Sequence, residues 1–204
     1  MTDVVVIDSG GANLASLQFA LQRLGARCTV SADADRIRQA THVLLPGVGA
    51  AHDTMSRLRA QRLDTLIPTL TQPLLGICLG MQLLYTESAE ATAGTSSTRT
   101  LGIIPGRVEK LLATPQQPVP HMGWNQLEPL RADPLFEGIN TGEHVYFVHS
   151  YAAPLSENTL TASEYGSRFT AAVRCGNFCG VQFHPERSAG TGARVLANFL
   201  AQKY

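Results

Sequence analysis

The chain is poor in charge and has no long hydrophobic run. Charged residues make up 16% of its 204 residues, and 16 Lys and Arg are balanced by 16 Asp and Glu. No segment is rich in Lys or Arg, so we expect no binding to nucleic acid through neutralisation of its phosphates. No run of about eighteen apolar residues occurs, so we expect neither a membrane-spanning helix nor a membrane partner.

Cysteine is also scarce, with only Cys28, Cys78, Cys175 and Cys179. The N-terminus lacks the basic region and the cleavage site of a signal peptide, so we expect a cytoplasmic protein without a disulfide framework. Cys175 and Cys179 are close in sequence, but no second Cys/His pair lies nearby to complete a zinc site. We therefore predict no metal site and no bound cofactor.

Short apolar runs alternate with helical patterns in the first half of the chain. Runs rich in β-branched residues and without polar interruptions are typical of strands buried on both faces of a parallel sheet. The alternation predicts one α/β domain over residues 1–204, with a doubly wound, mostly parallel sheet flanked by helices and a smaller antiparallel portion. The predicted strands are 4–7, 27–30, 42–45, 73–77, 107–111, 145–149, 160–162, 169–173 and 178–183. The predicted helices are 14–24, 34–40, 52–70 and one near the C-terminus, and 88–100 is predicted to be a loop.

The most informative segment is Gly76-Ile77-Cys78-Leu79-Gly80-Met81-Gln82. A glycine, a cysteine and a second glycine stand between an apolar strand and a helical pattern, which is the layout of a nucleophile elbow. Glycines are needed there because the turn strains the backbone at the nucleophile. The N–H groups at the helix start favour a thiolate. A buried structural cysteine is the alternative, and the segment alone leaves both interpretations open.

His184 is the candidate base for this thiol. It ends a predicted strand, and Pro185 stops strand pairing there. If the extended geometry continues through Pro185, His184 and Glu186 project to the same side, and Glu186 can orient the imidazole. A solvated His and Glu at a strand end is the alternative. Since Cys78 precedes them on a predicted elbow, a triad of Cys78, His184 and Glu186 is the stronger interpretation.

Acyl transfer also needs hydrogen-bond donors where the oxyanion develops. The N–H of Leu79, at the predicted helix start, is one candidate. The loop Pro46-Gly47-Val48-Gly49 is the other, because it ends a predicted parallel strand at the same sheet edge and its glycines let the Val48 peptide turn. An ordinary strand-to-helix turn is the alternative. The Gly10-Gly11 pair lacks G-x-G-x-x-G, so we predict no dinucleotide site.

The cysteine elbow together with the later Phe-His-Pro-Glu strongly resembles the class I (triad-type) glutamine amidotransferases, which have a flavodoxin-like fold. Segments 8–14, 45–49, 120–125 and 181–188 narrow the resemblance to the glutaminase subunits of imidazole glycerol phosphate synthase, and they span nearly the whole chain. The resemblance implies that Cys78, with His184 and Glu186, hydrolyses L-glutamine. It also implies a heterodimer with a (βα)₈-barrel cyclase, which receives the ammonia and forms imidazole glycerol phosphate and AICAR in histidine biosynthesis.

Roles for further residues follow only from this resemblance. The implied oxyanion hole is Leu79 with Val48 or Gly49, the implied glutamine contacts are Gly49, Gln82, His149, Ser150 and Tyr151, and the implied partner interface is His121, Met122, Trp124 and Arg187. The chain departs from the usual family residues at Ser9 and Ala12, which replace Tyr and Gly, and at Arg187, which replaces Lys. Two alternatives remain: another triad-type glutaminase or γ-glutamyl hydrolase, and a non-catalytic interaction module.

Overall fold

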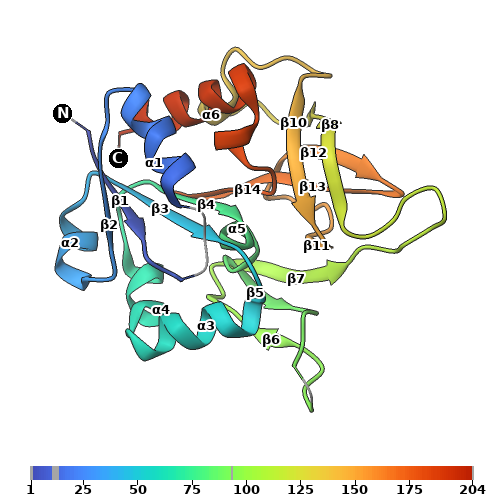
Figure 1. Ribbon diagram of the computed structural model, residues 1–204, viewed down its shortest axis with the longest axis horizontal. Coiled ribbons are helices and arrows are strands. Elements are labelled where there is room, and N and C mark those ends of the chain that lie inside the picture. Colours follow the sequence, from blue (N-terminus) through green and yellow to red (C-terminus); the bar gives the residue numbers. More distant parts are fainter. Residues whose placement is uncertain (1, 11–13, 93, 204) are drawn as a thin grey trace.

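An eight-stranded sheet runs through the centre of the protein (Figure 1). The computed structural model describes residues 2–10, 14–92 and 94–203. In spatial order the strands are β2 (Arg27–Ser31), β1 (Asp3–Ile7), β3 (His42–Gly47), β4 (Leu74–Cys78), β14 (Phe178–Val181), β13 (Ser167–Cys175), β12 (Thr159–Tyr165) and β9 (Glu128–Pro129). The strands from β2 to β14 are parallel, and β13, β12 and β9 continue the sheet in antiparallel pairing. The predicted fold class is therefore confirmed.

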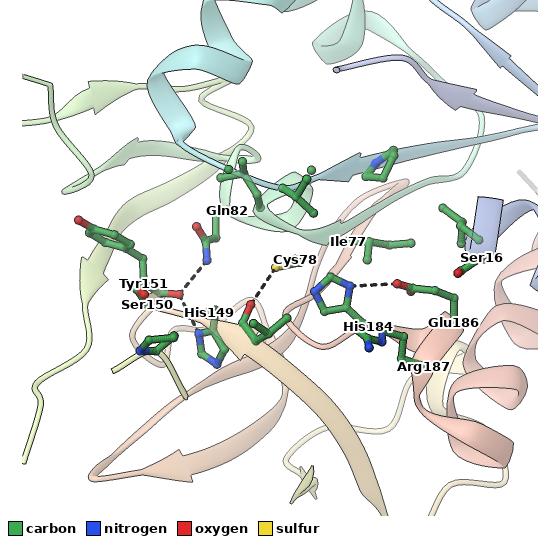
Figure 2. A pocket seen from close by; sticks show the side chains of 18 of the residues that line it. Ser16, Ile77, Cys78, Gln82, His149, Ser150, Tyr151, His184, Glu186 and Arg187 are labelled. Atoms are coloured by element: carbon green, nitrogen blue, oxygen red, sulfur yellow. Dashed lines mark hydrogen bonds and ion pairs between the residues drawn. The ribbon is translucent and has the colours of Figure 1, made fainter. Parts of the chain in front are cut away.

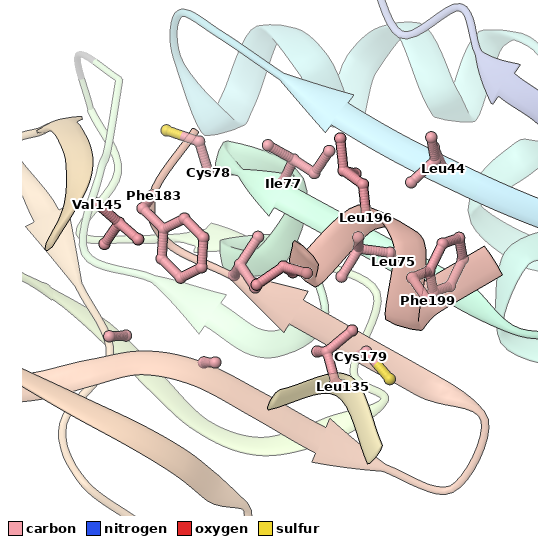
Figure 3. Close-up of a cluster of buried hydrophobic side chains, with 14 of the residues drawn as sticks. Leu44, Leu75, Ile77, Cys78, Leu135, Val145, Cys179, Phe183, Leu196 and Phe199 are labelled. Carbon is pink, nitrogen blue, oxygen red and sulfur yellow. The ribbon is translucent and has the colours of Figure 1, made fainter. Parts of the chain in front are cut away.

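Helices cover both faces of this sheet (Figure 1). One face carries α1 (Leu14–Arg23) and α6 (Ala189–Ala201), and the other carries α2 (Ala34–Gln39), α3 (Ala51–Ala60) and α4 (Leu63–Leu66). Alternate strand residues point to opposite faces, so Val4 and Val6 join one buried cluster while Val5 and Ile7 join the other. Cys78 lies at the border of the first cluster (Figure 3). No helix in the described ranges is long and apolar enough to cross a membrane.

Two smaller sheets stand beside the central one. The four-stranded sheet has the order β11 (Tyr151–Ala152), β7 (Ile104–Lys110), β5 (Tyr85–Ser88) and β6 (Thr98–Arg99), and the two-stranded sheet pairs β8 (His121–Gln126) with β10 (His144–His149). The remaining elements are α5 (Leu79–Gln82) and the 3₁₀ helices η1 (Ile67–Thr69), η2 (Pro134–Phe136) and η3 (Pro185–Arg187). The strands predicted at 107–111 and 145–149 correspond to β7, which ends at Lys110, and to β10, whereas β5, β6, β8, β9 and β11 were not predicted.

Two predicted helices differ from the structure. The expected helix over 52–70 is broken at Arg62, whose φ of 57° is left-handed, and continues as α4 and η1. Leu58 and Leu63 are both buried, so the apolar pattern continues across the break and hides it. The helical pattern after Cys78 was expected to reach Tyr85, but α5 ends at Gln82 and Tyr85 begins β5. Helix α5 is therefore only one turn long, and its dipole is that of a single turn. It can stabilise a thiolate less than the longer helix suggested by the sequence.

Candidate active site

Cys78 occupies a strained turn between β4 and α5. Its φ of 54° and ψ of −113° are unusual for a residue with a side chain, as expected of a nucleophile elbow. Both flanking glycines are required sterically. A Cβ at Gly76 would lie 2.6 Å from the carbonyl oxygen of Gly80, and a Cβ at Gly80 would overlap the carbonyl of Leu45. Glycine is therefore needed on both sides of Cys78 for a steric reason, as predicted.

The loop after β3 lies directly beside this elbow. Gly47 is opposite Cys78 in the parallel pairing of β3 with β4, so Val48 and Gly49 follow at the same sheet edge. A Cβ at Gly47 would lie 2.9 Å from the backbone nitrogen of the second elbow glycine, so the close approach depends on glycine there. Gly49 has a φ of 92°, in the region that favours glycine. Val48, Gly49 and Leu79 line the same cavity as Cys78.

Ser9, one of the departures from the usual family residues, supports this loop from behind. It is buried, and its Oγ donates a 2.8 Å hydrogen bond to the carbonyl of Pro46. Its own carbonyl accepts a 2.7 Å hydrogen bond from Nε of Arg57 in α3. A serine at this position therefore ties the end of β3 to α3. Ala12, another departure, lies outside the described residues.

His184 lies between the sulfur of Cys78 and the carboxylate of Glu186 (Figure 2). Its backbone N–H donates to the carbonyl of Tyr146, which fixes the segment after β14 against β10. Nδ1 of His184 and Oε1 of Glu186 are 3.0 Å apart. The predicted proximity is found, but its cause was predicted wrongly. Pro185 begins η3, so a 3₁₀ turn and not an extended backbone brings Glu186 back to the imidazole.

The electrostatics of His184 match its position between a thiol and a carboxylate. Burial lowers the pKa of His184, but hydrogen bonding and charge interactions with Cys78 and Glu186 outweigh burial and raise the pKa to about 10. At neutral pH the imidazole therefore carries a positive charge beside the sulfur. Such a charge attracts the negative charge that develops on the sulfur, as in other Cys–His pairs. Cys78 itself is only 7% exposed, so this attraction acts largely out of water.

The three residues open into a cavity of about 480 Å³ at the carboxyl ends of the parallel strands. All residues assigned to glutamine binding line it, and they come from the loop after β3, from α5 and from the turn after β10: Gly49, Gln82, His149, Ser150 and Tyr151. Nε2 of Gln82 donates to the carbonyl of Tyr151 at 2.7 Å, and Nδ1 of His149 shares that carbonyl at 2.9 Å (Figure 2). His149 is buried and faces the cavity only in part.

The residues predicted to contact a partner fall into two groups. Met122 and Trp124 are 65% and 53% exposed and project from β8 on the same side as Tyr146 of β10. Trp124 packs edge-to-face on Tyr146, with 6.0 Å between ring centroids, and the guanidinium of Arg187 lies 4.9 Å from the centroid of the same ring. We call Met122, Trp124, Tyr146 and Arg187 the aromatic face. Because Arg187 also lines the cavity, this face adjoins its mouth.

His121 does not belong to this face, and its assignment to a contact surface is wrong. It is 3% exposed, since strand alternation turns it inward between its outward-facing neighbours. Its ring stacks on Tyr165 at 4.1 Å and on Phe147 at 4.9 Å, and its Nδ1 is 2.9 Å from Nε2 of His149. His121 therefore acts from the interior of the protein.

Sequence reasoning missed two residues at the site. Glu90 lines the cavity, and its Oε2 accepts a 2.7 Å hydrogen bond from the N–H of Ala51 at the start of α3. It lies in the segment predicted as a featureless loop, so no signal singled it out. Gln182 is fully buried, and its Nε2 lies 3.7 Å from the sulfur of Cys78. Its position two residues before His184, at the end of the strand predicted over 178–183, could have indicated that both face the thiol.

All four cysteines are free thiols, and Cys175 and Cys179 flank the turn between β13 and β14. Among the described residues, no group of three or more His, Cys, Asp or Glu side chains is arranged to hold a metal ion.

Comparison with known proteins gives the context of this site. Residues 5–203 match the family Glutamine amidotransferase class-I. The chain is 52% identical over 200 residues to the imidazole glycerol phosphate synthase subunit HisH of Xylella fastidiosa strain Temecula1, covering 98% of each chain. It is 50% identical over 204 residues to the subunit of the same name from Xanthomonas campestris pv. campestris, covering 100% of each.

Solved structures share the fold at much lower identity. A crystal structure of a glutamine amidotransferase has a TM-score of 0.72 at 21% identity, with 97% of this chain and 96% of that chain covered. PurLQS from Thermotoga maritima has a TM-score of 0.66 at 18% identity, with 98% and 97% covered. The match over nearly the whole sequence, with a cysteine elbow facing a histidine, leads to one conclusion. The chain belongs to the class I glutamine amidotransferase family.

Proposed function

We propose that this chain is the glutaminase subunit of an imidazole glycerol phosphate synthase and releases ammonia from glutamine. One observation carries the proposal: Cys78 lies on a strained elbow beside the His184–Glu186 pair, in a chain about half identical over its whole length to subunits of that synthase. The elbow supports thiol chemistry on an amide. The similarity supports this synthase as the enzyme that uses the ammonia.

In the first half of the reaction, the Cys78 sulfur bonds to the side-chain amide carbon of glutamine. The carbonyl oxygen becomes an oxyanion and accepts hydrogen bonds from the N–H of Leu79 and of Val48 or Gly49. His184 then gives its proton to the amide nitrogen, the carbon–nitrogen bond breaks, and ammonia leaves a γ-glutamyl thioester.

In the second half, neutral His184 takes a proton from water, and the resulting hydroxide adds to the thioester carbon. The carbon–sulfur bond breaks and glutamate leaves, which restores the thiolate beside a protonated imidazole. Glu186 keeps the imidazole in one orientation through both halves because Nδ1 remains bonded to its carboxylate.

The cavity offers complementary groups for the amino-acid end of glutamine. An α-ammonium needs acceptors, and the acceptors at the cavity wall include the carboxylate of Glu90 and Oε1 of Gln82, whose NH₂ is already bonded to Tyr151 and Gln182. The α-carboxylate needs donors, for which the backbone N–H groups of Gly49 and of the Ser150–Tyr151 turn are suited.

We infer that the aromatic face is where a (βα)₈-barrel cyclase binds in a heterodimer. It is exposed, it includes an arginine and three large apolar or aromatic side chains, and it adjoins the mouth of the cavity from which ammonia leaves. The cyclase would use the ammonia to form imidazole glycerol phosphate and AICAR in the cytoplasm. Neither nucleic acid nor a membrane has a part in this function.

Glutaminase assays with and without the barrel cyclase and its ligand test the proposal. We expect slow glutamine hydrolysis by the isolated chain and faster hydrolysis in the liganded complex, because the glycine-flanked Val48 peptide can change orientation when the partner binds. Trp124→Ala should weaken complex formation, whereas Leu112→Ala, at an 82% exposed apolar residue elsewhere, should not. Equal, fast turnover with and without the cyclase would favour an independent glutaminase or γ-glutamyl hydrolase, and no turnover in either case would favour a non-catalytic module.

A further inference from the structure

A buried polar network adjoins the cavity and reaches the sulfur of Cys78. It comprises Gln182, Gln82, His149 and His121, all buried, and none of them belongs to the triad. Buried amides and imidazoles are costly unless their hydrogen bonds are satisfied, and a connected network restricts each member to one orientation. In this network, the orientation of the Gln182 amide decides whether its NH₂ group faces the sulfur of Cys78.

The backbone carbonyl of Tyr151 determines which amide atoms of Gln82 and Gln182 donate hydrogen bonds and which accept them. A carbonyl can only accept, so the group of Gln82 that lies 2.7 Å from it must be the NH₂. The second N–H of that NH₂ donates to Oε1 of Gln182 at 2.9 Å. The oxygen of Gln182 is thereby fixed toward Gln82, and its NH₂ is turned toward Cys78, with Nε2 3.7 Å from Sγ.

The same carbonyl also sets the histidine side of the network. Nδ1 of His149 must be protonated because it donates to Tyr151, so Nε2 of His149 accepts from Nδ1 of His121 at 2.9 Å. Nε2 of His121 then faces the amide nitrogen of Asn125 at 3.3 Å. Burial lowers the pKa of His121 to about 4 and that of His149 to about 3, so both rings are neutral, as this order of donors requires.

The sulfur needs a donor from the network only once it has lost its proton. As a thiol, Cys78 donates to the carbonyl of Val148 at 3.7 Å. As a thiolate it can only accept, and the same carbonyl then presents a negative dipole end to it. His184 faces the sulfur and can donate to the thiolate, but it must give up its proton during the reaction. Gln182 keeps its N–H throughout.

We propose that Gln182 is a catalytic residue that donates a hydrogen bond to the Cys78 thiolate, held in the donating orientation by Gln82 and the carbonyl of Tyr151. The proposal rests on the proposed function, in which Cys78 is the nucleophile. His149 and His121 are positioning residues, since they occupy the other lone pair of the Tyr151 carbonyl and hold it in place. The remaining charged or titratable side chains that line the cavity are His184 and Glu186 from the segment after β14, and Glu90, Tyr151 and Arg187 at the cavity wall.

Alkylation of Cys78 by iodoacetamide tests this without requiring glutamine to bind. The rate is measured as a function of pH by mass spectrometry of the peptide that contains Cys78, in the full chain. In Gln182→Met, which keeps the length but removes the donor, we expect the pH midpoint of alkylation to rise by about one unit and glutaminase kcat/KM to fall about tenfold, with KM nearly unchanged. Gln72→Met is the matched control, because the amide of Gln72 is also a hydrogen-bond donor, to the carbonyl of Ile37, but lies away from the site.

An unchanged midpoint in folded Gln182→Met would overturn the proposal, as would an equal shift in Gln72→Met. If Gln182→Met does not fold, Gln182→Asn replaces it, since its amide is one methylene too short to reach the sulfur. Gln82→Met should shift the midpoint in the same direction by a smaller amount, because Gln182 is then free to turn. Failure of the proposed function is distinguished by Cys78→Ala, which would then retain glutaminase activity whatever the alkylation result.

Discussion

Replacing Glu186 with glutamine removes one negative charge from the site and almost nothing else. The side chain keeps its length, and its amide oxygen can still accept from Nδ1 of His184, which is 3.0 Å from the carboxylate oxygen in the native protein. The side chains of His184 and Glu186 are 10% and 11% exposed, so water screens their interaction poorly. The change therefore isolates the electrostatic contribution of Glu186.

The size of the effect can be bracketed. A hydrogen bond to a charged group contributes about 1.5–3 kcal/mol and a neutral one about 0.5–1.5 kcal/mol, which sets a lower limit near 1 kcal/mol. Two unit charges about 4 Å apart at an effective dielectric constant of about 20 interact by about 4 kcal/mol, which sets the upper limit. Glutaminase kcat/KM should accordingly fall by about 5- to 700-fold, because each 1.4 kcal/mol is about a factor of ten.

The pH profile provides a second readout. Glu186 is one of the groups that raise the pKa of His184 to about 10, so the variant should have a lower His184 pKa. Because the reaction needs a protonated His184, the alkaline limb of kcat/KM should move to lower pH. Glu143→Gln is the matched control, since Glu143 also accepts hydrogen bonds from neighbouring groups but lies away from the site. A folded Glu186→Gln protein with kcat/KM within twofold of wild type and an unshifted alkaline limb would refute the proposed role of Glu186.

Two further predictions concern the fold around the site. In urea titration, Gly80→Ala should lower the free energy of unfolding by about 1–3 kcal/mol, because the added Cβ overlaps a backbone carbonyl that cannot rotate away. Gly190→Ala is the control, since Gly190 lies on α6 with open space around it, and it should not lower the stability of the protein. Equal effects of the two changes would contradict the steric account. The ¹⁵N shifts of His121 and His149 should show neutral rings with protonated Nδ1 from pH 8 down to pH 5. Folding lowers both pKa values, so the neutral rings contribute their full share to the free energy of unfolding above pH 6.5. This contribution is lost as the pH falls toward 4, by at most about 1.4 kcal/mol per pH unit for each ring. Titration of either ring near pH 6.5 would contradict the network.

The parts of the site that local sterics fix were predictable from sequence. Gly76 and Gly80 signal the elbow because no other residue fits against the backbone there. The parallel strands were predictable because burial on both faces demands continuous apolar runs. The pairing of His184 with Glu186 was also foreseen, although through the wrong local geometry.

The parts that depend on tertiary packing were not predictable. Nothing near Glu90 indicates that the turn after β5 folds over the cavity, and nothing near His121 indicates which side of β8 faces inward. Arg62 adopts a left-handed conformation without the glycine that usually marks one. The direction of the Gln182 amide depends on a carbonyl supplied by Tyr151, more than thirty residues before it in the chain.

The central claim is that Cys78 takes ammonia from glutamine for a partner enzyme. The most direct test is the rate of imidazole glycerol phosphate synthesis by the complex of Cys78→Ala with the barrel cyclase, measured once with glutamine and once with ammonium salt. We predict that glutamine-dependent synthesis is abolished while ammonia-dependent synthesis stays at the wild-type rate. Loss of both activities, or persistence of the glutamine-dependent one, would contradict the account.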